Sequence, residues 1–104
     1  MNILNKLVPD WLRIGMNISM LGMINKNIRL ITVEYDEIKR FINICSYLDR
    51  EINEDDKEDM EILITELWSM MGQYFDDADF KCIYSTHTQK ELNMLNGAVF
   101  RRKE

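Results

Sequence analysis

The chain has few residues that could cross-link it or interrupt its secondary structure. Only two cysteines occur, Cys45 and Cys82, whereas small disulfide-stapled secreted domains usually carry about four or more. We therefore expect two free thiols in a reducing compartment, with an intramolecular disulfide as the alternative. No apolar run reaches the roughly 18 residues that a membrane span needs. The N-terminal segment also has no small-residue cleavage site. These absences predict a cytoplasmic protein with no membrane contact.

Side chains suited to chemistry are equally scarce. His87 is the only histidine, and together with the two cysteines it gives three ligands for zinc, where a structural site needs four. The four glycines stand at 15, 22, 72 and 97, so no phosphate-binding loop is present. The acidic residues lack the spacing of a calcium-binding EF-hand loop. We therefore expect no catalytic, cofactor-binding or metal-binding residues, and no enzyme activity.

Acidic side chains, by contrast, are abundant and concentrated. The whole chain carries a net charge of −5, and residues 51–61 alone contain seven acids and one lysine. Net acidity opposes direct binding to nucleic acid, because such affinity comes from neutralising phosphates with Lys and Arg. Part of the cluster fits a solvated joint before a helix, where Asp55 or Asp56 caps the first turn and the helix dipole favours acids. Capping needs only one or two acids, so the surplus indicates a partner-binding acidic surface. That surface consists of Glu51, Glu54, Asp55, Asp56, Glu58, Asp59 and Glu61.

Hydrophobic periodicity suggests how the chain folds. Residues 12–20 alternate apolar and polar side chains without exception, which favours a strand, although a buried helix over 10–24 is the rival. Residues 24–27 are turn formers, and residues 28–33 read as a second strand that completes an antiparallel hairpin. Thr32 then suits the N-cap of an amphipathic helix that reaches residue 52. A second amphipathic helix is expected from about Asp56 to Phe75.

The C-terminal part gives weaker patterns. Residues 80–84 fit either a short strand or a helical turn, and Thr88 with Glu91 matches a capping box. We favour a short helix that stops at Asn96-Gly97, over a hairpin turn at that dipeptide. The resulting prediction is an α+β fold in a single domain, residues 1–104. An N-terminal β-hairpin packs on two long helices, with a short C-terminal helix and an all-α fold as the alternative. Residues 1–8 and 101–104 are expected to fray.

These features predict a small acidic binding protein that regulates or inhibits a larger protein by direct contact. The partner would present a basic surface. In one form, a phage or mobile-element inhibitor would use acids to mimic nucleic acid and block a nucleic-acid-binding host or defence protein. The alternative is a homodimeric structural or adaptor domain, because methionine-rich apolar surfaces suit protein partners. Its apolar interface would use Trp68, Met71 and Phe75.

Overall fold

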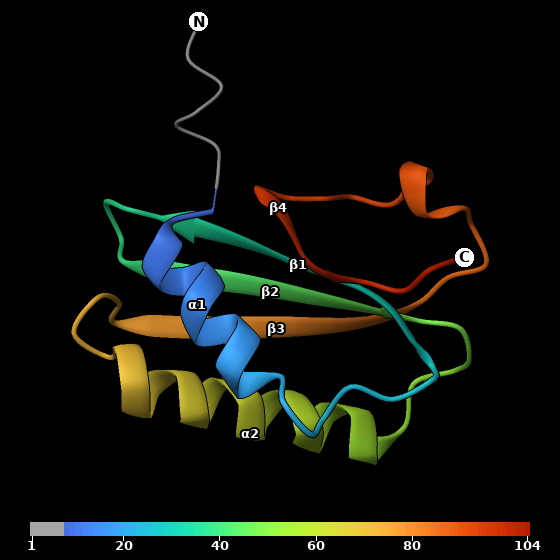
Figure 1. The fold of residues 1–104 in the computed structure, drawn as a ribbon, viewed down its shortest axis with the longest axis horizontal. Helices are drawn as coiled ribbons and strands as arrows, with labels where there is room; N and C mark the ends of the chain where they lie inside the picture. Colours follow the sequence, from blue (N-terminus) through green and yellow to red (C-terminus); the bar gives the residue numbers. More distant parts are fainter. Residues whose placement is uncertain (1–7) are drawn as a thin grey trace, which may run out of the picture.

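Four strands form one mixed sheet, and two helices pack on it (Figure 1). The computed structural model describes residues 8–104. The elements are α1 (Asp10–Ser19), β1 (Ile28–Asp36), β2 (Phe41–Leu48), α2 (Glu54–Met71), β3 (Asp77–Tyr84), the 3-10 turn η2 (Gln89–Glu91) and β4 (Gly97–Arg101). The predicted architecture, an N-terminal hairpin on two long helices, is therefore wrong, and so is the all-α alternative. The molecule is an α+β domain built on a four-stranded mixed sheet.

The strand order is β3-β2-β1-β4. β1 pairs antiparallel with both β2 and β4, whereas β2 pairs parallel with β3. A parallel pair needs a long crossover connection, and α2 supplies it, running alongside β3 (Figure 1). The expected segments 28–33 and 80–84 thus lie within β1 and β3. Neither of them pairs with residues 12–20.

The strand predicted over residues 12–20 is a helix, α1. Its buried residues are Leu12, Gly15, Met16 and Ser19, spaced by three and four positions as on one helical face. The sequence alternation arose because Ile14 and Ile18, which look like core residues, are exposed. Gly15 and Ser19 are small enough to lie at a helix contact, so two residues that read as polar belong to the buried side.

The helix predicted from Thr32 to residue 52 is also wrong, because the segment forms β1, a tight turn and β2. Thr32 lies fully buried within β1 instead of capping a helix. Asp36 Oδ1 accepts hydrogen bonds from the backbone N–H groups of Ile38 and Lys39, both at 3.0 Å. Arg40 completes the turn at φ 54°, a conformation that usually belongs to Gly or Asn. Asp36 is therefore the one conventional turn residue at this hairpin, because residues 37–40 contain no Gly, Asn or Pro.

The main core lies between the sheet and the two helices. It is formed by buried residues of α1, α2 and the inner sheet face, among them Leu12, Ile31, Ile44 and Leu63, together with Phe75 from the loop between α2 and β3. A smaller cluster covers part of the opposite sheet face. There Leu30, Cys45 and Tyr47 pack under the segment that joins β3 to β4. The rest of that outer face is open.

The C-terminal residues, expected to fray, are held by ion pairs. Arg29 donates from Nε and Nη2 to the two carboxylate oxygens of Glu104, both at 2.7 Å, and from Nη1 to the carbonyl of Ser85 at 2.8 Å. Arg102 pairs with Asp49 at 2.7 Å. The expected C-terminal helix is only the turn η2, and Gly97 opens β4. The fraying expected for residues 1–8 lies outside the described residues, except at Val8, which is buried.

Candidate functional site

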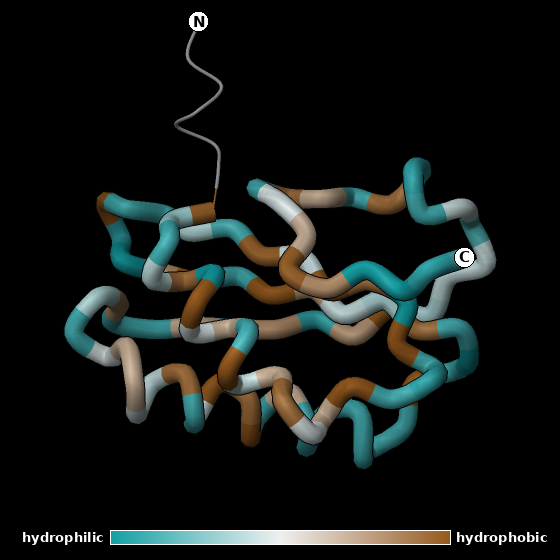
Figure 2. Tube along the Cα trace, viewed as in Figure 1, coloured by the Kyte–Doolittle hydropathy of each residue, from teal (hydrophilic) through white to brown (hydrophobic). Residues whose placement is uncertain are grey.

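The predicted acidic surface lies at the first three turns of α2 and the residues just before it. Asn53 is the N-cap, in place of the expected Asp55 or Asp56, and its side chain accepts from the backbone N–H of Asp56 at 3.0 Å. Glu54, Asp55 and Asp56 occupy the first helical turn, where the positive end of the helix dipole stabilises acids. Figure 2 shows this hydrophilic end of the helix.

Asp56 differs from the other acids because it is buried. Its side chain is turned toward Arg50, which donates to both carboxylate oxygens at 2.7 and 2.9 Å. The same carboxylate accepts from the backbone N–H of Asn53 at 2.9 Å, which completes a capping box. The Arg50 hydrogen bonds hold the pKa of Asp56 below its usual value, against the opposing effect of burial. Asp56 therefore stabilises the start of α2, and a partner does not meet it directly.

The remaining acids form the accessible part of this surface. Glu51, Glu54, Asp55, Glu58 and Glu61 are exposed, and Asp59 is half-buried. Lys57 pairs with Glu54 across 3.6 Å. Within residues 8–104, none of Asp55, Glu58 and Glu61 forms an ion pair. These three unneutralised carboxylates lie on one rigid helix.

The predicted apolar interface of Trp68, Met71 and Phe75 is only partly available. Phe75 is 1% exposed and belongs to the core, where its ring meets those of Trp11 and Trp68. Met71 is half-buried at the contact with α1, beside Gly15. Trp68 alone is exposed, at 46%. The structure therefore does not bring the three residues together on one open face, and self-association stays a prediction.

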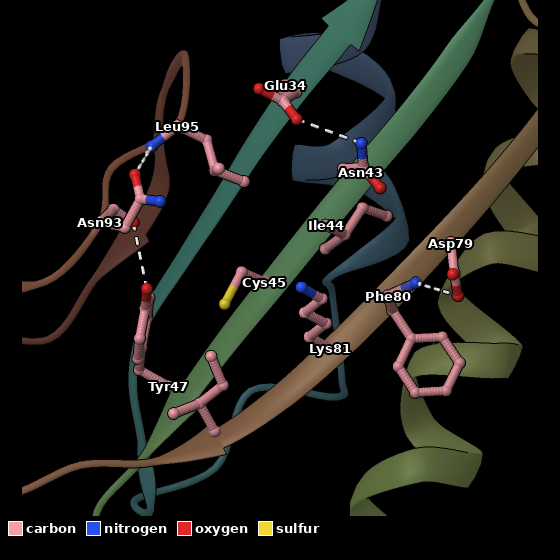
Figure 3. A pocket seen from close by; sticks show the side chains of 11 residues that line it. Glu34, Asn43, Ile44, Cys45, Tyr47, Asp79, Phe80, Lys81, Asn93 and Leu95 are labelled. Atoms are coloured by element: carbon pink, nitrogen blue, oxygen red, sulfur yellow. Dashed lines mark hydrogen bonds between the residues drawn. The ribbon is translucent and has the colours of Figure 1, made fainter.

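A pocket that no sequence pattern predicts lies on the outer face of the sheet (Figure 3). It has a volume of about 210 Å³, and it is lined by three adjacent strands and by the segment that joins β3 to β4. Pairing places Glu34, Asn43 and Asp79 in one row across β1, β2 and β3. Cys45, Tyr47 and Lys81 lie on the same face of β2 and β3. Only strand pairing brings these residues together, so no linear motif could have signalled the pocket.

The chemistry of this pocket favours binding over catalysis. Asn43 donates to the Glu34 carboxylate at 3.1 Å, and the Tyr47 hydroxyl donates to the carbonyl of Asn93 at 3.3 Å. Burial raises the pKa of Cys45, which disfavours the reactive thiolate. Burial likewise raises the pKa of Cys82 to about 11. The two cysteines occupy opposite faces of the sheet, so their thiols do not face each other.

Within residues 8–104, no three His, Cys, Asp or Glu side chains are grouped so that they could hold a metal ion. Neither of the helices in this range combines the length and the apolar character needed to cross a bilayer.

Comparison with known proteins adds a family to this geometry. The family model described as MafI2 immunity protein matches residues 9–104, a range that contains both helices and all four strands. No curated protein matches the chain.

Proposed function

Because the chain belongs to the MafI2 immunity protein family, we propose that it neutralises a toxin by placing the exposed acids of α2 against a basic patch on that toxin. An immunity protein is an inhibitor that binds a toxin partner. The expectation of an inhibitor acting through protein–protein contact is therefore confirmed at this level. The family also fits the expectation that the chain is not an enzyme.

The observation that carries the proposal is the set of unneutralised carboxylates on α2. Asp55, Glu58 and Glu61 are exposed on a helix whose start is fixed by the Asn53–Asp56 capping box. Their positions are thus set before a partner arrives, which lowers the entropic cost of binding. A row of carboxylates complements Lys and Arg on a partner and speeds association at low salt.

Nucleic-acid mimicry is the strongest form of this complementarity. A toxin that acts on nucleic acid carries a basic channel for phosphates. In that case the acids of α2 would occupy the channel in place of the phosphates, and inhibition would follow from exclusion of the substrate. The net charge of −5 fits such a role and opposes direct binding of nucleic acid by the chain itself.

A charge-reversal triple variant tests the proposal. The toxin is first identified by affinity capture from source-cell lysate with mass spectrometry, and its affinity is then measured with purified proteins by calorimetry. We expect D55K/E58K/E61K to lose most of the affinity, and the wild-type affinity to fall as salt is raised, because salt screens exposed charges. Asp56 is left unchanged because it stabilises the fold.

The matched control is E37K/D77K/D79K, which makes the same change in net charge at exposed positions away from α2. This variant should bind the toxin within a few-fold of wild type. Undiminished binding by the α2 variant would overturn the proposal. A larger loss of affinity in the control would also overturn it, and would indicate that the toxin contacts the sheet side. Circular dichroism of both variants verifies that each is folded.

A further inference from the structure

A groove of about 460 Å³ lies between α2 and the loop that follows α1. Its apolar walls come from residues of the loop and of α2, including Leu21, Ile24 and Ile62. All three of these side chains are exposed, although large aliphatic groups are usually buried. An apolar surface left open beside charged residues is typical of a binding site.

Two carboxylates border this groove. Asp59 and Glu66 both line it, and their spacing of two helical turns puts them on the same side of α2. Neither side chain forms an ion pair with any residue in the described part of the chain. The groove therefore combines apolar walls with two negative charges that lack a cation.

Ser19 provides a second, independent observation at this groove. It lines the groove and is 2% exposed. Among residues 8–104, its hydroxyl is the one buried side-chain oxygen or nitrogen without a hydrogen-bond partner. An unsatisfied buried hydroxyl is costly, and an incoming N–H donor would remove that cost.

We infer that this groove receives an arginine side chain of the toxin, an inference that rests on the proposed function. The three methylenes of an arginine pack on apolar walls, while its guanidinium remains available to polar groups. The guanidinium offers five donors in a planar fork, so it can bond a carboxylate and still donate to a second acceptor. Lysine fits less well, because its ammonium is a compact and strongly hydrated charge.

The test uses N-acetyl-arginine methylamide as the probe and its citrulline analogue as the neutral isostere. Backbone amide shifts of the labelled protein are followed by NMR during titration. We expect the arginine probe to cause saturable shifts confined to residues 19–25 and 59–66, and the citrulline probe to cause none there. Equal responses to both probes, or shifts spread over every acidic segment, would overturn the inference.

Three variants test which residues of the groove bind the probe. D59N/E66Q should abolish the saturable response, whereas D55N/E58Q, which removes the same charge from α2 outside the groove, should retain it. S19A should lower the affinity for the arginine probe by roughly two- to tenfold, which corresponds to the loss of one hydrogen bond. The same variant should leave the unfolding midpoint of the free protein unchanged or raise it. A purely structural Ser19 would instead lower that midpoint and leave the probe affinity unaltered.

The inference and the proposed function fail separately. If the arginine probe does not bind but D55K/E58K/E61K still loses affinity for the toxin, the acidic-surface proposal is retained and the inference about the groove is contradicted. If the probe binds in the groove but toxin affinity is insensitive to the α2 charge reversal, the acidic-surface proposal fails.

Discussion

Asp55 and Asp56 are adjacent in sequence and have different environments. Asp55 is exposed at the start of α2, while Asp56 is 6% exposed and bonded to Arg50 and to the backbone of Asn53. The difference arises from helix geometry, since only the third residue after an N-cap can return a bond to the cap's N–H. A continuous run of acids can therefore contain one buried carboxylate that stabilises the fold beside several that are exposed.

Because Asp56 is buried and Asp55 is exposed, neutralising Asp56 should lower the free energy of unfolding more. The substitution D56N removes a buried charge that Arg50 and the capping box require, and we expect it to lower the free energy of unfolding by roughly 1.5–3 kcal/mol. Urea denaturation followed by circular dichroism measures the change. D55N is the matched control and should alter the free energy by no more than about 0.5 kcal/mol. Similar losses in both variants would show that Asp56 has no special structural role.

At the scale of elements, the contact between α1 and α2 depends on Gly15. A Cβ atom built at Gly15 would lie 2.6 Å from Leu67 Cδ1 and 3.0 Å from Met71 Cγ. These distances are shorter than ordinary van der Waals contact, so a side chain at this position must displace the side chains of Leu67 and Met71. The close approach also explains why a glycine occupies the buried face of a helix.

Gly15→Val is expected to destabilise the protein by about 1–3 kcal/mol, because overpacking displaces neighbouring side chains. The urea midpoint measures the effect. Asn17→Val, at an exposed position of the same helix, introduces the same β-branched residue without a clash and serves as the control. Helix propensity alone would favour Gly15→Val and leave Asn17→Val almost neutral, so an equal loss in both variants would contradict the packing explanation.

The elements also show what the sequence could and could not predict. The helix expected from about Asp56 to Phe75 exists as α2, Glu54–Met71, because a long amphipathic stripe has few alternative structures. The helix predicted from Thr32 to residue 52 is wrong because β2 is almost wholly buried on both faces. A nearly continuous apolar run fits a helix as readily as a strand.

The candidate site was predictable to a similar degree. The acids of residues 51–61 are contiguous, so their surface was visible in the sequence. The inward turn of Asp56 depends on Asn53 being the cap, and the sheet pocket depends on the pairing of three strands. Phe75 was assigned to an interface because periodicity cannot distinguish a core face from a binding face.

At the scale of the whole molecule, an ion pair between Arg29 in β1 and Glu104 holds the C-terminal end of the chain against the sheet. The Arg29 hydrogen bonds lower the pKa of Glu104 from 4.5 to about 2. Since the folded pKa lies below the unfolded one, this stabilisation is complete above about pH 4.5 and is lost as the pH falls toward 2.

E104Q tests that dependence because glutamine keeps the shape of the side chain but does not titrate. We expect the wild-type unfolding midpoint to decline between about pH 4.5 and pH 2, and the E104Q midpoint to start lower and decline less over the same interval. Thermal melts in a series of buffers measure both. Parallel curves for the two proteins would assign acid sensitivity to other carboxylates.

The strand order has a consequence for how the chain folds. Asp36 pairs with Phe41 across a tight turn, whereas Thr32 pairs with Ala98. Contacts between neighbours in sequence form at little entropic cost, and distant contacts require closure of a long loop. We therefore expect the β1–β2 hairpin to form first and β4 to pair with β1 late. Until β4 pairs, the β1 edge of the sheet would be open to pairing with another chain.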